Sequence, residues 1–379
     1  MVERLLAKEK VAGSTPVCRS KRFQPRLVFF VTSPFLAYTL LMFRRLPLIF
    51  GLIFLPLIFI WAGFAVTAST SSASDKTTSN SITEPSTFYN LPSTTPSSVK
   101  ITFVGDIMLA REVEKAIIKN GVDYPFAAIK DQWSGSDLVI GNFESTIRDA
   151  YRYEGEVLAF DTLPSSIVGL KNAGFTNLSL ANNHGDDFGS AVTTATHQAL
   201  TNLGLQTFGD PVESQLHIVH WKSSPSYGGV SGGLNIALIG FHAFLEEPQT
   251  IATAIIAEKA AGNFVIVMPH WGNEYQIEPS PAQVDAAQMF VDAGADLIVG
   301  AHPHIIEPIN TVSGIPVAYS LGNFVFDQDW SVATTQGMML QITITDTNIT
   351  ITPVAISIHN RQPSLGTFPV PATQTWNRN

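Results

Sequence analysis

The sequence contains almost no cysteine, and this excludes several kinds of chemistry. Only one of the 379 residues is cysteine, Cys18, and it precedes the longest apolar run of the chain. The part after that run therefore forms no disulfide, has no thiol nucleophile and holds no cysteine-ligated zinc. A Walker-type phosphate loop is also missing, because no helical pattern follows the glycines at 228, 229, 232 and 233, where we expect a flexible hairpin.

Positive charge is scarce outside the N-terminal segment. Residues 1–45 hold 9 of the 22 Lys and Arg but only 2 of the 31 Asp and Glu, so residues 46–379 are strongly acidic. A polyanion such as nucleic acid is repelled by an acidic surface. Nucleic-acid binding is therefore not expected.

A long apolar run, Leu46 to Val66, is the first organising feature of the chain. Its 21 uncharged residues are enough for a helix to cross a hydrocarbon core roughly 30 Å thick. Arg44 and Arg45 precede it, and such basic residues stay in the cytoplasm. We predict a single-pass, uncleaved signal anchor in the cell membrane, with the C-terminal domain on the extracytoplasmic side.

An earlier apolar run covers Leu27 to Phe43. Two spanning helices would leave Arg44 and Arg45 in the turn between them, on the wrong side of the membrane. A start at Met42 gives instead the basic start, apolar core and small residues of a signal sequence. We therefore divide the chain into a basic segment (1–45, with Met42 as alternative start), the anchor (46–66), a Ser/Thr-rich linker (67–99) and a folded domain (100–379).

Within the folded domain, a short apolar strand ends in a polar cluster six times. In α/β sheets, ligands bind at the carboxyl ends of strands, so these clusters are candidates for one common site. The clusters begin at Gly105-Asp106, Gly141-Asn142, Asn182-Asn183, His270-Trp271, His302 and Gly322-Asn323.

Helical patterns separate most of these strands. They cover Glu112 to Lys119, Ser165 to Ala173, Ser190 to Leu203, Thr250 to Ala261 and Pro281 to Ala293. Near the C-terminus, Met338 to Thr345 and Ile349 to Ile358 alternate like an antiparallel pair, with the polar turn Asp346-Thr347-Asn348 between them. The pattern predicts an α/β (α+β) domain with mixed sheets packed face to face and flanked by helices.

The stretch LIVGAHPHIIE, Leu297 to Glu307, is the centre of this prediction. Two histidines at i and i+2 in extended backbone project to the same side, so His302 and His304 would offer two imidazoles to one point. Pro303 between them restricts the backbone.

The complete set of candidate metal ligands has carboxylate, amide and imidazole donors and no sulfur. This donor set suits Mn²⁺, Fe²⁺ or Zn²⁺, and a bridging carboxylate allows one or two ions. The candidate ligands are Asp106, Glu144, Asn183, His270, His302 and His304.

Each of these residues also has a structural interpretation. Asp106 would cap a helix, Glu144 would pair with Arg148, Asn183 would sit in a turn, and His270 would be a buried core histidine. Their recurrence at equivalent strand ends favours the functional interpretation. Four other histidines fit no such spacing and are interpreted as structural, namely His197, His217, His220 and His242.

The motifs GDIML, GNFES, LANNHGDDFG, PHWGNEY, GAHPH and SLGNFVFD resemble those of the bacterial capsule synthesis protein CapA family, over residues 100–328. That family is in turn similar to the calcineurin-like metallophosphoesterases. The resemblance implies a four-layer αββα sandwich of the metallo-dependent phosphatase type, in which Glu144 is the bridging carboxylate. It further implies that His184, oriented by Asp187, protonates a leaving group, and that substrate contacts come from Asn182, Trp271, Glu274 and Asn323. Trp271 and Tyr275 also have a structural interpretation, as wall or core residues.

One position departs from the metallophosphoesterase pattern. Their D-x-H motif reads Asp106-Ile107-Met108 here, so one histidine ligand is missing and one of two ions would be held weakly or not at all.

The resemblance implies a membrane-anchored protein that acts in the synthesis, export or trimming of a capsule polymer, poly-γ-glutamate. Its expected partners are the cytoplasmic membrane, the polymer and membrane-bound polymer synthase subunits, and a local cationic surface would include Arg111 and Arg148. Two alternatives remain open: an extracellular metallophosphoesterase acting on nucleotides or phospho-sugars, and a non-catalytic accessory subunit of a membrane polymerase complex. If the protein is an enzyme, it is a metal-dependent hydrolase.

Overall fold

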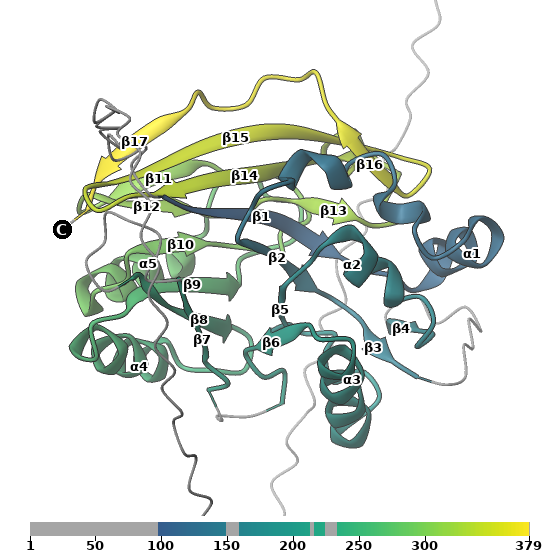
Figure 1. Ribbon diagram of the computed structural model, residues 1–379, viewed down its shortest axis with the longest axis horizontal. Helices are drawn as coiled ribbons and strands as arrows, with labels where there is room; N and C mark the ends of the chain where they lie inside the picture. Colours follow the sequence, from purple (N-terminus) through teal and green to yellow (C-terminus); the bar gives the residue numbers. More distant parts are fainter. Residues whose placement is uncertain (1–97, 149–158, 213–215, 224–232, 379) are drawn as a thin grey trace, which may run out of the picture. The chain divides into compact units, whose positions relative to one another are not determined.

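The computed structural model describes residues 98–148, 159–212, 216–223 and 233–378 (Figure 1). The predicted basic segment, the predicted anchor and nearly all of the Ser/Thr-rich linker lie outside these residues. So do three of the four glycines of the predicted hairpin. No helix within the described part of the chain is long and apolar enough to cross a bilayer.

The larger sheet has nine strands and is mixed. Its order is β16-β15-β14-β1-β2-β5-β6, with β13 also paired to β1 and β17 to β15. Because β1, β2, β5 and β6 run parallel, their carboxyl ends lie at one edge. The strands are β1 (Val99–Ile107), β2 (Leu138–Phe143), β5 (Asn177–Ser179), β6 (Gln206–Phe208), β13 (Asn323–Val325), β14 (Gln336–Ile344), β15 (Asn348–His359), β16 (Gln362–Leu365) and β17 (Gln374–Asn377).

The second sheet has six strands in the order β11-β12-β10-β9-β8-β7. Its four central strands are parallel and its two edge strands antiparallel. The strands are β7 (Val219–Lys222), β8 (Asn235–His242), β9 (Phe264–His270), β10 (Leu297–Val299), β11 (Ile309–Val312) and β12 (Ile315–Ala318). A separate short pair joins β3 (Thr146–Ile147) to β4 (Asp161–Thr162).

Five α-helices and three short 3₁₀ helices complete the described part of the chain. The helices are α1 (Arg111–Asn120), α2 (Val168–Ala173), α3 (Ser190–Asn202), α4 (Pro248–Ala260), α5 (Pro281–Ala293), η1 (Tyr124–Phe126), η2 (Lys130–Trp133) and η3 (Ala333–Thr335). The start of α5 shows how the sequence fixes such an end. Ser280 accepts a hydrogen bond from Gln283 N, the Gln283 side chain accepts one from Ser280 N, and Pro281 has no N–H to leave unpaired.

Three hydrophobic clusters hold the layers together. The central cluster lies between the two sheets and joins β1 and β14 to β8, β9 and β10, for example Phe103 and Leu340 to Leu238 and Ile266. One outer cluster packs α1, α2 and α3 on the larger sheet, and the other packs α4 and α5 on the second sheet. Figure 1 shows these two groups of helices beside their sheets.

Strand β8 illustrates how alternation produces this layering. Ile236 and Leu238 belong to the central cluster, whereas Ala237, Ile239 and Phe241 belong to the cluster under α4 and α5. Successive side chains of a strand point to opposite faces, so a continuous apolar run serves both layers.

The predicted α/β class is confirmed: the described residues form several sheets and few helices. All five predicted helical segments contain a helix, although α2 begins at Val168 rather than near Ser165. The predicted C-terminal antiparallel pair is also present as β14 and β15. This pair is part of the larger sheet, because β14 also pairs with β1.

Backbone segments approach one another closely near the strand ends, and this requires glycine. A Cβ on Gly105 would lie 1.8 Å from the carbonyl oxygen of Gly322, and one on Gly300 would lie 2.0 Å from that of Tyr319. No side chain fits at such distances. The glycines before Asp106 and before His302 therefore let the segments that carry these residues pack against neighbouring backbone.

Candidate metal centre at the strand ends

The predicted ligands come from the carboxyl ends of strands in both sheets. Asp106 lies at the end of β1 and Glu144 follows β2 in the larger sheet. His270 ends β9, and His302 and His304 follow β10 in the second sheet. Asp106, Glu144, His270, His302 and His304 are all buried.

One half of the centre combines two carboxylates with an imidazole. One ligand atom from each of Asp106, Glu144 and His304 lies within 4.8 Å of the others. The amide nitrogen of Asn323 donates to Gln328 Oε1 and to the Thr334 carbonyl, so Asn323 Oδ1 accepts from His304 Nδ1 at 3.0 Å. This leaves His304 Nε2 facing Glu144 Oε1 at 3.9 Å.

The other half combines two imidazoles with an amide oxygen. His270 Nε2 lies 2.6 Å from Asn183 Oδ1 and 3.0 Å from His302 Nδ1. Asn183 itself is exposed, so this half opens toward solvent, whereas the rings of His270 and His302 are buried. His270 Nε2 thus has two other donor atoms within hydrogen-bonding distance, which makes three donor atoms in this half.

Asn142 connects the two halves, although it was not among the predicted site residues. Its side-chain nitrogen donates to Asp106 Oδ1 at 2.8 Å and lies 3.1 Å from His270 Nδ1. Its oxygen accepts from Asn182 Nδ2 at 3.2 Å. The signal was available, since Asn142 stands in the same strand-end cluster as Glu144.

The backbone of the histidine pair differs from the prediction. His302 has φ 101° and His304 has φ 60°, so neither residue is in an extended conformation. The Pro303 carbonyl between them accepts a hydrogen bond from Tyr275 N at 2.9 Å. The two rings contact different halves of the centre: His302 Nδ1 lies beside His270 Nε2, whereas His304 Nε2 faces Glu144. The extended geometry that we expected is wrong.

Burial determines the protonation of the centre. Burial raises the pKa of Glu144 well above its ordinary value, although the nearby His304 opposes this. Burial alone would lower the pKa of His304, but the carboxylates of Glu144 and Asp106 raise it to about 9. Burial and neighbouring imidazoles lower the pKa of His302 to about 3 and that of His270 well below its ordinary value. His270 and His302 are therefore neutral at pH 7, as metal binding requires.

Glu144 is the least satisfied residue of the centre. Both of its carboxylate oxygens are buried and have no hydrogen-bond partner. Its nearest basic neighbours, His184 Nε2 and His304 Nε2, lie 3.8 and 3.9 Å away, beyond hydrogen-bonding distance. A buried carboxylate without partners is costly, and a cation is the group that would satisfy it.

The predicted proton donor forms a pair with its predicted partner. His184 Nδ1 lies 2.9 Å from Asp187 Oδ2, which also accepts a hydrogen bond from Phe160 N at 2.7 Å. The Phe160 ring stacks on the His184 imidazole at 3.7 Å between centroids. These contacts fix the imidazole with its Nε2 toward Glu144.

The four predicted substrate residues differ in position. Asn182 is buried and donates to the Phe143 carbonyl as well as to Asn142, and buried Asn323 holds His304; both orient other residues. Glu274 is exposed and close enough to disfavour the charged form of Glu144. Trp271 is buried in the core under α5, where its Nε1 donates to the Tyr319 carbonyl. The prediction for Trp271 is therefore wrong, because substrate cannot reach this ring.

Met108, which replaces a histidine of the metallophosphoesterase pattern, points away from the centre. Its side chain belongs to the hydrophobic cluster under α1 to α3, and its sulfur accepts a hydrogen bond from Ala110 N. It supplies no ligand to the carboxylate half.

The two arginines expected to form a cationic surface are both paired. Arg111 forms an ion pair with Asp327 and lies 4.5 Å over the Phe160 ring. Arg148 lies 3.4 Å from Asp161 and 4.0 Å over the Phe188 ring. Their charges are balanced by neighbouring carboxylates, so they contribute little net positive potential.

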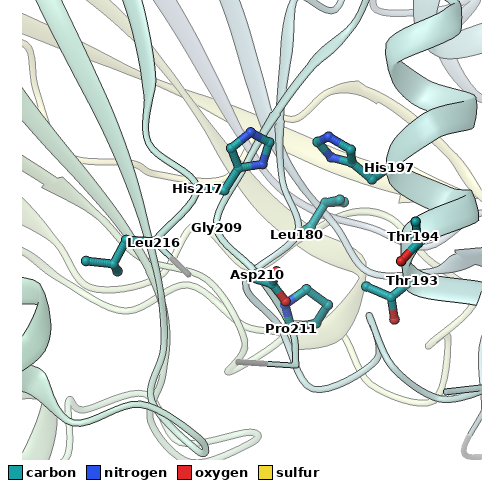
Figure 2. A pocket seen from close by; sticks show the side chains of 9 residues that line it. All are labelled: Leu180, Thr193, Thr194, His197, Gly209, Asp210, Pro211, Leu216 and His217. Carbon is teal, nitrogen blue, oxygen red and sulfur yellow. The ribbon is translucent and has the colours of Figure 1, made fainter. Parts of the chain in front are cut away.

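The four histidines interpreted as structural have different surroundings. His220 is exposed and pairs with Glu258 at 2.8 Å, as expected for a surface residue. His197 and His217 lie 4.7 Å apart between ring centroids and line a separate pocket of about 300 Å³ (Figure 2). None of the predicted site residues lines that pocket. His242 differs from the other three, because its ring lies 6.3 Å from that of His270.

Exposed aromatic residues surround the histidines of the centre. Phe244 packs edge-on against His302 at 4.6 Å between centroids and Tyr275 stacks on His304 at 6.0 Å. Trp330 in turn contacts Tyr275. Phe244 and Trp330 were not predicted, since single aromatic residues in loops carry no spacing signal.

Fold and site together define an α/β protein with a candidate divalent-metal centre at its strand ends. A family model described as bacterial capsule synthesis protein PGA_cap matches residues 100–328. The chain therefore belongs to the bacterial capsule synthesis protein family.

Curated relatives agree with this assignment. The PGA biosynthesis protein CapA of Bacillus subtilis is 33% identical over 306 residues, which cover 76% of this chain and 73% of that protein. The capsule biosynthesis protein CapA of Bacillus anthracis is 34% identical over 248 residues, or 61% of this chain and 60% of that protein. A probable polyglutamine synthesis accessory protein of Mycobacterium tuberculosis is 27% identical over 217 residues, or 52% of this chain and 57% of that protein.

Proposed function

We propose that this protein is a membrane-anchored accessory protein of poly-γ-glutamate capsule synthesis, whose extracytoplasmic domain takes part in making, exporting or trimming the polymer through a divalent-metal centre. The family and the names of its relatives support the capsule role. The apolar run at residues 46–66 supports the anchor. The layered order of helices, two sheets and helices supports a sandwich of the metallo-dependent phosphatase type.

The main support for the metal proposal is that the donor atoms are spaced as ligands of one cation would be. Two ligands at about 2.1 Å from a cation, on adjacent coordination positions, are about 3.0 Å apart. His270 Nε2 and His302 Nδ1 are 3.0 Å apart, with Asn183 Oδ1 beside them. The unpartnered Glu144 oxygens lie in the carboxylate half with Asp106 and His304. Asp106, Glu144 and His304 would hold one ion, and Asn183, His270 and His302 a second.

A bound divalent cation would polarise the scissile group and favour ionisation of a nearby water. The chain itself supplies the proton chemistry. Asp187 holds His184 through Nδ1, so its Nε2 is directed toward the centre, where it would protonate a leaving atom. Phe160 keeps the ring in this orientation by stacking on it.

The charge balance explains why a polyanion would need the metal. The domain is acidic, and the two arginines nearest to the centre already pair with carboxylates. Polymer carboxylates would otherwise meet Asp106, Glu144 and Glu274. The cation would supply the positive charge that holds them.

Two observations favour the alternative functions. The His184–Asp187 pair favours a hydrolase, and phosphoesters of nucleotides or phospho-sugars are chemically suitable substrates. Met108, turned into the hydrophobic core, favours a non-catalytic accessory subunit that binds polymer synthase subunits in the membrane.

Elemental analysis of the purified full-length chain, together with His302→Ala and His184→Ala, tests the proposal. We expect near-stoichiometric metal in the wild type and in His184→Ala, and loss of metal in His302→Ala. Poly-γ-glutamate and an aryl phosphate are then incubated with each protein. Shortening of the polymer that requires both metal and His184 supports trimming, and turnover of the aryl phosphate alone supports the phosphoesterase. A wild-type protein without metal after incubation with Mn²⁺, Fe²⁺ or Zn²⁺ refutes the metal centre.

A further inference from the structure

His242 is a buried histidine whose imidazole has no hydrogen-bond partner. It is the last residue of β8 and is 6% exposed. Neither Nδ1 nor Nε2 contacts a donor or an acceptor. By contrast, His270, His302 and His304 each have a polar partner on at least one ring nitrogen. A polar ring buried without partners is disfavoured unless something binds it.

The position of His242 relates it to the imidazole half of the candidate metal centre. It pairs in parallel register with His270 on the neighbouring strand, and the two rings are 6.3 Å apart between centroids. The rings of His270 and His302 are 4.6 Å apart. Two imidazoles on one cation, each with a metal–nitrogen distance of about 2.1 Å, have ring centroids roughly 4.5 to 6.5 Å apart, depending on the angle between them. The 4.6 Å separation corresponds to adjacent coordination positions, and the 6.3 Å separation to nearly opposite ones.

One further feature suits a metal ligand. Phe244 packs edge-on against His242, His270 and His302, which places a hydrophobic cover on the same three rings. A hydrophobic shell around a metal centre limits access of water to it.

We infer that His242 is an additional ligand of the cation held by His270 and His302. The inference rests on the metal centre of the proposed function and deepens it. With His242, this half has three imidazoles and an amide oxygen, whereas the other half has two carboxylates and one imidazole. Imidazole-rich sites suit Zn²⁺ and Fe²⁺, and carboxylate-rich sites suit Mn²⁺. The two positions therefore differ in the metal that they prefer.

The test compares metal binding by the full-length, detergent-solubilised wild type with that of His242→Ala, His242→Leu and the control His220→Ala. His220 is the matched control because it is exposed and its partner, Glu258, lies outside the centre. Zn²⁺ affinity is measured by competition with a chromogenic chelator, and the visible absorption of the Co²⁺-loaded proteins reports the ligand set. Far-UV circular dichroism in EDTA identifies any variant that does not fold, and the leucine variant retains the bulk of the side chain.

We expect both His242 variants to bind one metal equivalent at least tenfold more weakly and to shift the Co²⁺ absorption bands, while His220→Ala matches the wild type. Unchanged affinity and an unchanged Co²⁺ spectrum in a folded His242 variant would overturn the inference. If His302→Ala abolishes binding in that same experiment, the metal centre of the proposed function stands without His242. If the wild type binds no metal, both are wrong.

Discussion

The substitution Glu144→Gln should have opposite effects on the stability of the domain without metal and on its stabilisation by metal. The carboxylate of Glu144 is buried, has no partner on either oxygen, and lies near Asp106. Gln has almost the same shape but no charge, so the variant removes the carboxylate whose pKa burial raises. We therefore expect the metal-free variant to be at least as stable as the wild type, as is common when a strained functional residue is neutralised.

With metal bound, the wild type should be more stable than the Glu144→Gln variant. A cation present at 100 times its dissociation constant stabilises the wild type by about 2.7 kcal/mol. For a domain of this size, about 2–4 °C per kcal/mol converts this to a rise in Tm of roughly 5–10 °C. If the Glu144→Gln substitution weakens binding about 100-fold, the same metal concentration adds only ~0.4 kcal/mol, or about 1 °C.

Differential scanning calorimetry with EDTA and with added Mn²⁺ or Zn²⁺ measures both effects. Glu112→Gln is the matched control, because Glu112 is a half-buried acid on α1 whose partner is Lys115. It should retain the metal-dependent rise of the wild type. A Glu144→Gln variant whose Tm rises with metal as much as that of the wild type would refute the assignment of Glu144 as a ligand.

Three further predictions concern protonation and packing. His304 has a pKa of about 9 and must lose its proton to bind metal. Apparent metal affinity should therefore rise about tenfold per pH unit up to pH 9 and then level off. A metal affinity that does not change with pH would contradict this. The pKa of His242 is depressed to about 4, so the metal-free domain should lose up to about 3 kcal/mol as the pH falls from 6.5 to 4; urea unfolding should find this loss reduced in His242→Leu. A Cβ at Gly105 would lie 1.8 Å from the Gly322 carbonyl oxygen, so Gly105→Ala should prevent folding or lower the free energy of unfolding by several kcal/mol. Gly135 has open space around it, and Gly135→Ala should lower the free energy of unfolding by about 1 kcal/mol in the same assay.

The strand-end pattern predicted which residues meet but not how they meet. Asp106, Glu144, His270 and His302 follow apolar strands, and parallel pairing brings those ends together whatever the details of the loops. His302 and His304 have positive φ values, and the Pro303 carbonyl between them accepts a hydrogen bond from Tyr275, which lies in another loop. Local sequence does not encode that contact.

The residues that were missed or misassigned have equally physical causes. The strand β8 ends in a single histidine rather than a cluster of polar residues, so His242 gave no signal comparable to that of the other strand ends. Trp271 stands beside His270, but neighbouring side chains point in opposite directions, and this one packs into the core under α5. Which neighbour faces the centre is decided by the packing of two sheets.

The pairing of β1 with β14 also determines when the domain can finish folding. Phe103 on the first strand is opposite Leu340, near the end of the chain, and Asp106 is opposite Asn323 on β13. A chain that emerges from the ribosome or from a membrane channel with its N-terminus first has β1 long before β13 and β14. Contacts of such long range form slowly, and until then the edge of β1 that later pairs with β14 is open to wrong partners. The candidate ligands therefore come together only after the last strands arrive, and a metal ion would be taken up in the compartment where the C-terminal third of the chain is delivered.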